Sequence, residues 1–122
     1  MRILVVDDDI NLLESIGRGL RSKGYQVIEA LSAEEALKHI NFDNESAVDL
    51  ILADYVMPGM SGIDLLEKVR EKSNSLPVII MTAHWKKQVV IDAMRKSCNN
   101  FIEKPFTLDK LIEEIAVAIK YK

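Results

Sequence analysis

The stretch Ile3-Leu4-Val5-Val6-Asp7-Asp8-Asp9 decides the fold class, because a run of four apolar residues ends abruptly at three carboxylates. A continuous run of Ile, Val and Leu is typical of a strand buried on both faces of a parallel sheet. In residues 25–29 a weaker alternation of polar and apolar residues indicates a partly exposed edge strand. Amphipathic segments separate this run from four further apolar runs, at residues 25–30, 50–53, 78–81 and 101–102. Five strand–helix repeats predict an α/β fold with an open sheet, right-handed crossovers and helices on both faces.

The first and last amphipathic segments have clear helix boundaries. Asp9 is the expected N-cap of the first helix, and Gly24 is expected to end it in a left-handed cap. Thr107 is the expected N-cap of the last helix. Apolar residues recur at helical spacing in both segments: Ile10, Leu13, Ile16 and Leu20 in the first, and Leu108, Leu111, Ile112, Ile115 and Ile119 in the last.

Two further helix starts are marked by short capping motifs. Ser32 and Glu35 have the spacing of a capping box, in which Glu35 reaches back to the amide of Ser32. Ser61 and Asp64 offer a weaker version of the same motif. The polar residues 41–46 are expected to form a surface loop.

Composition excludes several classes of protein. The 122 residues are 48% hydrophobic and 29% charged, which predicts one globular domain over residues 1–122 rather than a disordered or fibrous chain. Sixteen Lys and Arg against nineteen Asp and Glu give a net charge of −3, which disfavours a dedicated nucleic-acid binder. The lone Cys98 cannot form an internal disulfide. Without an apolar run of membrane-spanning length or a signal peptide, we expect a cytoplasmic location and no membrane contact.

Polar residues stand where four of the predicted strands end. Three aspartates follow the first strand, and Asp54, Thr82 and Lys104 follow the third, fourth and fifth. In open α/β sheets, ligands bind outside the carboxyl ends of the strands. A single aspartate after a strand is usually a turn residue, but four polar strand ends in one chain favour a site. Asp9 is assigned to helix capping alone.

The charge of this cluster constrains its ligand. Asp7, Asp8 and Asp54 with Lys104 carry a net charge of −2, and crowded carboxylates raise one another's pKa unless a cation compensates. A divalent cation cancels this charge, and oxygen ligands favour Mg²⁺ over Zn²⁺. Because a carboxylate can accept a phosphoryl group, the cluster predicts Mg²⁺-dependent phosphoryl transfer onto an aspartate. Lys104 and the Thr82 hydroxyl would then donate to phosphoryl oxygens.

In this order, these residues resemble the receiver domain of two-component response regulators. The matching segments are Ile3 to Asp8, Asp54 with Met57-Pro58-Gly59 and Gly62, Met81-Thr82-Ala83, and Lys104-Pro105-Phe106. Each motif alone is weak, whereas the ordered combination is specific and covers nearly the whole chain. The resemblance implies a flavodoxin-like (βα)5 open sandwich with a five-stranded parallel sheet of order 2-1-3-4-5.

The resemblance also implies the roles of the site residues. Asp54 would accept a phosphoryl group from the phosphohistidine of a partner kinase. Asp8, Asp54 and the backbone carbonyl of Val56 would bind Mg²⁺, and Asp7 would hold the coordinated waters. Lys104 would pair first with Asp54 and then with its phosphoryl group.

Further family features fall on other positions. Thr82 would move toward the phosphoryl group and let Phe101, the aromatic switch position, rotate inward. The peptide between Lys104 and Pro105 is expected to be cis, and the small Ala83 would leave room for a bulky phosphodonor.

Two positions are expected to tune the access of water to the phosphoryl group. Val56, two residues past the acceptor, cannot orient water with its side chain. His84, two residues past Thr82, is either a hydrogen-bond donor or base toward that water, or simply an exposed loop histidine.

One pair of residues departs from the family pattern. Ser97-Cys98 stands where Gly-Ala is usual before the fifth strand. Since Ser97 takes a left-handed conformation less easily than glycine, we expect Asn99 or Asn100 to take the positive φ instead. Cys98 is expected to be a small buried hydrophobe rather than a redox thiol.

The expected partners are proteins. A sensor histidine kinase or phosphotransfer protein would supply the phosphoryl group, and the fourth helix, fifth strand and fifth helix would signal to a downstream target or output domain. Residues 86–122 carry a net charge of +3 and residues 1–85 carry −6. This asymmetry fits an acidic partner or a homodimer induced by phosphorylation, and equally a solvated helix surface.

The sequence leaves two alternative functions open. A haloacid-dehalogenase-like phosphatase would use Asp7 as nucleophile in Asp7-x-Asp9, but the chain offers no cap insertion and no later acidic pair at a strand end. A receiver-like domain that binds partners without phosphorylation would not need the acceptor, metal and lysine positions that this chain retains.

Overall fold

Five parallel strands alternate with five helices over residues 1–40, 48–83 and 86–120, which are the residues that this computed structural model describes. Their bounds are β1 Arg2–Val6, α1 Ile10–Ser22, β2 Gln26–Ala30, α2 Ala33–His39, β3 Leu50–Asp54, α3 Gly62–Lys72, β4 Val78–Thr82, α4 Lys87–Arg95, β5 Asn100–Glu103 and α5 Leu108–Lys120. The predicted loop at 41–46 and the access position His84 lie outside the described residues. No helix within those ranges combines the length and apolar character that a membrane span requires.

The strand order is β2-β1-β3-β4-β5, and every neighbouring pair is parallel. The predicted flavodoxin-like order is therefore confirmed. β2 lies at one edge of the sheet, as its weaker alternation predicted, and only its last residue, Ala30, is fully buried. Because all strands run the same way, their carboxyl ends lie at the same end of the sheet.

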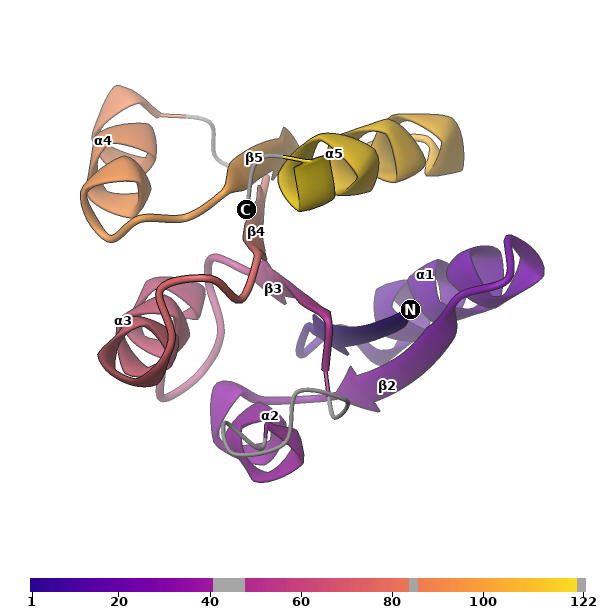
Figure 1. The fold of residues 1–122 in the computed structure, drawn as a ribbon, viewed down its shortest axis with the longest axis horizontal. Coiled ribbons are helices and arrows are strands. Elements are labelled where there is room, and N and C mark those ends of the chain that lie inside the picture. The colour runs from indigo at the N-terminus through magenta and orange to yellow at the C-terminus, as the bar shows by residue number, and fades with distance from the viewer. Residues whose placement is uncertain (41–47, 84–85, 121–122) are drawn as a thin grey trace.

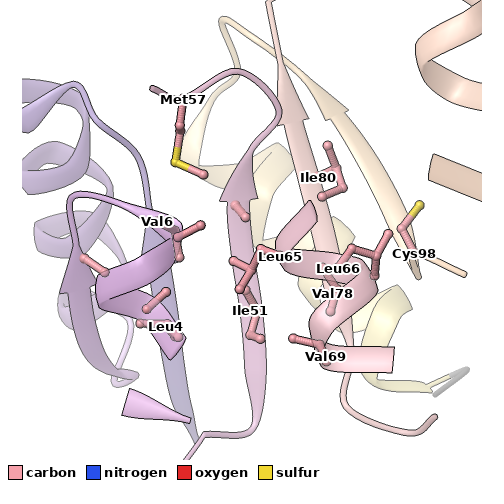
Figure 2. Packing of buried hydrophobic residues seen from close by; sticks show 14 of the residues in the cluster. Leu4, Val6, Ile51, Met57, Leu65, Leu66, Val69, Val78, Ile80 and Cys98 are labelled. Atoms are coloured by element: carbon pink, nitrogen blue, oxygen red, sulfur yellow. The ribbon is translucent and has the colours of Figure 1, made fainter. Parts of the chain in front are cut away.

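Helices cover both faces of this sheet. α1 and α5 lie on one face, and α2, α3 and α4 lie on the other (Figure 1). Successive residues of β1 alternate between the two cores: Leu4 packs with α2 and α3, and Val5 packs with α1 and α5. Figure 2 shows the first core, in which Leu65 of α3 lies beside Ile51 of β3. In the central strands β1, β3 and β4 both faces are apolar, and polar side chains stand only at the strand ends.

The predicted boundaries of the first and last helices are confirmed. The side chain of Asp9 accepts hydrogen bonds from two amides in the first turn of α1. Thr107 Oγ1 accepts from the Lys110 amide at 3.1 Å. Gly24 follows α1 with a φ of +93°, the left-handed conformation that glycine adopts without steric cost. The Lys104-Pro105 peptide is cis, as expected.

The two capping motifs differ from their predictions. Ser32 Oγ accepts from the Glu35 amide, but the Glu35 carboxylate accepts from the amide of Leu31 rather than that of Ser32. The motif predicted to be weaker is the complete one, since Ser61 and Asp64 each accept from the other's amide. The longer Glu35 side chain extends one residue further back along the chain than Asp64 does.

The end of α4 also differs from the prediction. Ser97 itself has the positive φ, 65°, so the assignment of that conformation to Asn99 or Asn100 is wrong. Lys96 is the C-cap of α4, and a left-handed residue must follow the cap directly if the chain is to turn back. Cys98 is buried in the core, as predicted.

Candidate functional site

The sheet brings two predicted site residues together at its centre. β1 pairs with β3 up to Val6 and Ala53, and the next residues on the two strands are Asp7 and Asp54. Both aspartates are almost fully buried, with exposed fractions of 1% and 8%. Their positions therefore follow from strand register alone.

The other polar residues at strand ends lie at the same carboxyl end of the sheet. Thr82 ends β4 and is 1% exposed, and the Lys104 amide donates to its carbonyl at 2.8 Å. Asp8 is exposed, and its carboxylate completes a cluster with those of Asp7 and Asp54. One oxygen from each of the three carboxylates lies within 4.8 Å of the others.

The Lys104 ammonium lies between two of these carboxylates. Its Nζ is 2.7 Å from Asp7 Oδ2 and 3.0 Å from Asp54 Oδ1. Asp7 Oδ1 accepts from the Asp9 amide at 2.9 Å, so both oxygens of Asp7 are engaged. The ion pair with Lys104 leaves Asp54 Oδ2 outside it.

The charges of the cluster shift two pKa values. Burial raises the pKa of Asp54, and the negative charge of Asp7 raises it further, against the lowering effect of Lys104. Burial alone would lower the pKa of Lys104, but its hydrogen bonds to Asp7 and Asp54 outweigh burial and raise it. The raised pKa of Lys104 reflects the two carboxylates that its ammonium contacts, and one lysine does not neutralise the three carboxylates of the cluster.

The backbone after Asp54 is held by close contacts. The Tyr55 amide donates to the Met81 carbonyl at 2.8 Å, and the Gly62 amide donates to the Tyr55 carbonyl at 3.1 Å. A Cβ at position 62 would lie 2.2 Å from the carbonyl oxygen of Asp54, so only glycine allows α3 to start this close to the end of β3. The glycine of the motif therefore fixes the loop that leaves the acidic cluster.

The remaining predicted residues surround the cluster at different depths. The Val56 side chain is 58% exposed, and Ala83 is also exposed. Phe101 is 7% exposed, so its ring already occupies an inward position in this structure.

Sequence reasoning missed one residue that contacts the loop after Asp54. Glu34, in the first turn of α2, accepts from the Met60 amide at 3.0 Å. The two residues are 26 positions apart, so no local pattern indicates their contact.

Comparisons with known proteins agree with this geometry. A family model described as response regulator receiver domain matches residues 3–116. Chemotaxis protein CheY1 of Helicobacter pylori is 36% identical over 122 residues, covering 98% of this chain and 97% of that protein. The crystal structure of a response regulator receiver domain protein from Clostridium thermocellum has a TM-score of 0.89 and 32% identity, with 98% of this chain and 94% of that chain covered.

Other relatives are much longer than this chain. It spans 31%, 28% and 50% of three curated relatives that each match 98% of its own length. One of them is named cyclic di-GMP phosphodiesterase, from Thermotoga maritima, and is 33% identical over 120 residues. The family match extends from β1 into α5, and the chemotaxis protein corresponds to this chain over nearly its full length. The chain belongs to the response regulator receiver domain family and is a phospho-accepting receiver of two-component systems.

Proposed function

We propose that Asp54 is the residue that accepts the phosphoryl group, and that the reaction depends on Mg²⁺. The observation that carries this proposal is the cluster of three carboxylates with oxygens within 4.8 Å, compensated by one ammonium. The phosphoryl donor is the phosphohistidine of a sensor histidine kinase or of a phosphotransfer protein. In the reaction a bond forms between an oxygen of Asp54 and phosphorus, and the bond from phosphorus to the histidine nitrogen breaks.

The donor atoms fit Mg²⁺. Asp8 and Asp54 would supply carboxylate oxygens, the Val56 carbonyl would supply a third oxygen, and Asp7 would hold coordinated waters. An all-oxygen donor set with excess negative charge favours a hard divalent cation. When bound, Mg²⁺ neutralises charge that develops on the phosphoryl oxygens.

Accessibility favours Asp54 over Asp7 as the acceptor. Both oxygens of Asp7 already accept hydrogen bonds, and its side chain is 1% exposed. Asp54 is more exposed and keeps Oδ2 outside its ion pair. This difference disfavours the haloacid-dehalogenase-like alternative, in which Asp7 is the nucleophile.

The other site residues bind the phosphoryl group and report its arrival. Lys104 donates to a phosphoryl oxygen in place of its bond to Asp54, and the Thr82 hydroxyl donates to another. Thr82 and Phe101 together bias a two-state equilibrium of the face formed by α4, β5 and α5. That face binds a downstream protein, an output domain or a second copy of the chain, in the cytoplasm and without direct contact to nucleic acid or membrane. The chain thus works as a switch and catalyses only its own phosphorylation and slow dephosphorylation.

Mass spectrometry after incubation with acetyl phosphate tests the proposal. We expect the wild type to gain one phosphoryl group with Mg²⁺ and none with EDTA. Asp54→Asn should gain none, and Asp109→Asn, which changes an exposed acid in α5, should behave as the wild type. Equal labelling of Asp54→Asn, or an unlabelled wild type, would reject the assignment, and steady hydrolysis of phosphate esters would favour the phosphatase.

A further inference from the structure

Glu34 connects α2 to the loop that follows the acidic cluster. It is the second residue of α2, which starts at Ala33 after the N-cap Ser32. Its Oε1 accepts from the Met60 amide at 3.0 Å, across 26 residues of sequence. Glu35, the next residue, accepts from the Leu31 amide on the other side of the same helix start. The two neighbouring carboxylates thus hold two different segments of backbone.

The loop of residues 56–60 has few other attachments. Its two ends are fixed, since the Tyr55 amide donates to the Met81 carbonyl and the Ser61 amide donates to Asp64. Between them, the Met57 side chain is buried and lies at the edge of the core (Figure 2). Over the part of the chain that the structure describes, the bond from Met60 to Glu34 is the one hydrogen bond that joins residues 56–60 to another element.

The loop turns beside the Glu34 carboxylate at Gly59. Gly59 has a φ of +76°, a conformation that L-residues rarely adopt. A Cβ at position 59 would lie 3.4 Å from Glu34 Oε1 and 3.6 Å from Oε2. Both are ordinary van der Waals distances, so the left-handed turn at Gly59, and not a lack of space, accounts for the glycine; the turn is followed at once by the Met60 amide that donates to Glu34.

We propose that Glu34 is a positioning residue for the Mg²⁺ site. It fixes residues 56–60 and thereby holds the Val56 carbonyl ready for the metal. This inference rests on the proposed function, in which that carbonyl is a ligand. A group that orients a ligand from outside the coordination sphere typically changes metal affinity when it is removed. The role needs an acceptor oxygen and no negative charge, so a glutamine side chain can also fill it.

The test compares Glu34→Ala, Glu34→Gln and Asp109→Ala by calorimetric titration with Mg²⁺. Asp109 is a matched control, because it is the exposed acid at the second position of α5. We expect Glu34→Ala to weaken Mg²⁺ binding about tenfold, the lower end of outer-sphere effects. Glu34→Gln and Asp109→Ala should stay within about twofold of the wild type, since neither removes the acceptor. Without metal, hydrogen exchange of the Met60 amide should be faster in Glu34→Ala than in the other three proteins.

The outcomes separate this inference from the proposed function. Wild-type affinity in Glu34→Ala overturns the positioning role, and so does an equal loss in Glu34→Gln, because the charge alone would then explain the effect. If the wild type takes up no Mg²⁺, the proposed function fails as well, and that result is visible before any variant is made. Circular dichroism of each variant verifies that the fold is retained.

Discussion

Two partly buried cations, Lys104 and Arg70, lie in very different surroundings. Lys104 sits at the carboxyl ends of the strands between Asp7 and Asp54, and its pKa is raised. Arg70 is on α3 near the opposite ends of β4 and β5, and burial lowers its pKa. One cation faces an excess of negative charge, whereas the other has no carboxylate within salt-bridge distance among the described residues.

Neutral oxygens satisfy the Arg70 guanidinium. Its Nη1 donates to the Leu76 carbonyl at 2.8 Å and the Ser73 carbonyl at 3.2 Å. Its Nε donates to the Ser97 carbonyl, and its Nη2 donates to Asn99 Oδ1, each at 2.9 Å. These four bonds tie the end of α3 to the segments that lead into β4 and β5.

The two cations differ in role, because Arg70 joins parts of the fold and Lys104 belongs to the proposed site. Around Arg70 each of the three guanidinium nitrogens donates to at least one neutral oxygen. Around Lys104 the protein holds three carboxylates together with one ammonium, an arrangement that costs stability unless a cation binds. Crowding of carboxylates beyond what one cation can neutralise, rather than buried charge as such, therefore distinguishes the carboxyl ends of the strands from the surroundings of Arg70.

Removing the Arg70 side chain, and with it four hydrogen bonds to neutral oxygens, should have the largest effect on stability. We expect Arg70→Ala to lower the free energy of unfolding by about 3 kcal/mol, since bonds to charged groups contribute about 1.5–3 kcal/mol each and the side chain is partly exposed. Arg70→Lys should recover little, because one ammonium lacks the planar fork that reaches four acceptors. Urea denaturation measures the loss, and the Mg²⁺ affinity of the folded variant should stay at the wild-type level. A loss below about 1 kcal/mol would show that the four bonds are incidental.

The gathering of polar residues at the carboxyl ends of the strands could be predicted from sequence, because local features determine it. The sequence shows apolar runs that end at Asp7, Asp54, Thr82 and Lys104. The parallel topology then brings these four residues to the same end of the sheet. Cys98 was also predictable as a small buried residue, and its environment agrees, since burial raises the pKa of its thiol to about 11. A thiol in that state is neutral near pH 7 and unreactive.

Replacing the Asp54 carboxylate should change the free energy of unfolding by less than Arg70→Ala does, and should raise it. Burial and Asp7 raise the pKa of Asp54 above its ordinary value of 3.8, so ionising this group costs the folded state energy. Without metal at pH 7, Asp54→Asn should be more stable than the wild type by about 1–2 kcal/mol, the usual size of a stabilising substitution.

The pH dependence fixes the sign of this effect. In the folded wild type Asp54 keeps its proton to higher pH than in the unfolded chain, so stability falls as pH rises through the folded pKa. The advantage of Asp54→Asn should therefore vanish below about pH 4. Mg²⁺ at tenfold excess over its Kd should stabilise the wild type by about 1.4 kcal/mol and narrow or reverse the difference, and EDTA should restore it. Thermal melts of both proteins with and without Mg²⁺ measure this, and a destabilised Asp54→Asn in EDTA would contradict the excess of charge.

Long-range contacts were beyond the sequence. The partners of Arg70 lie up to 29 residues away, and the amide bound by Glu34 lies 26 residues away, so neither contact leaves a periodic pattern. Ser97 was misjudged for a related reason. Propensity favours asparagine in the left-handed region, but the last turn of α4 decides which residue must turn, and the Arg70 bond to the Ser97 carbonyl holds it there.

Ser97→Gly should give the smallest effect and sharpens the comparison at the Arg70 side. Glycine adopts a φ of 65° without the cost that serine carries there, so we expect a gain of about 0.5–1 kcal/mol in unfolding free energy. The backbone carbonyl of residue 97 still accepts from Arg70 in this variant. If that bond defines the turn, the gain in stability should persist only while Arg70 is present. A double-mutant cycle with Arg70→Ala by urea denaturation measures this coupling. If the stability changes of the two substitutions were strictly additive, α4 alone would set the turn. The hydrogen bonds of Arg70 would then hold α3 to the sheet without shaping the chain between α4 and β5.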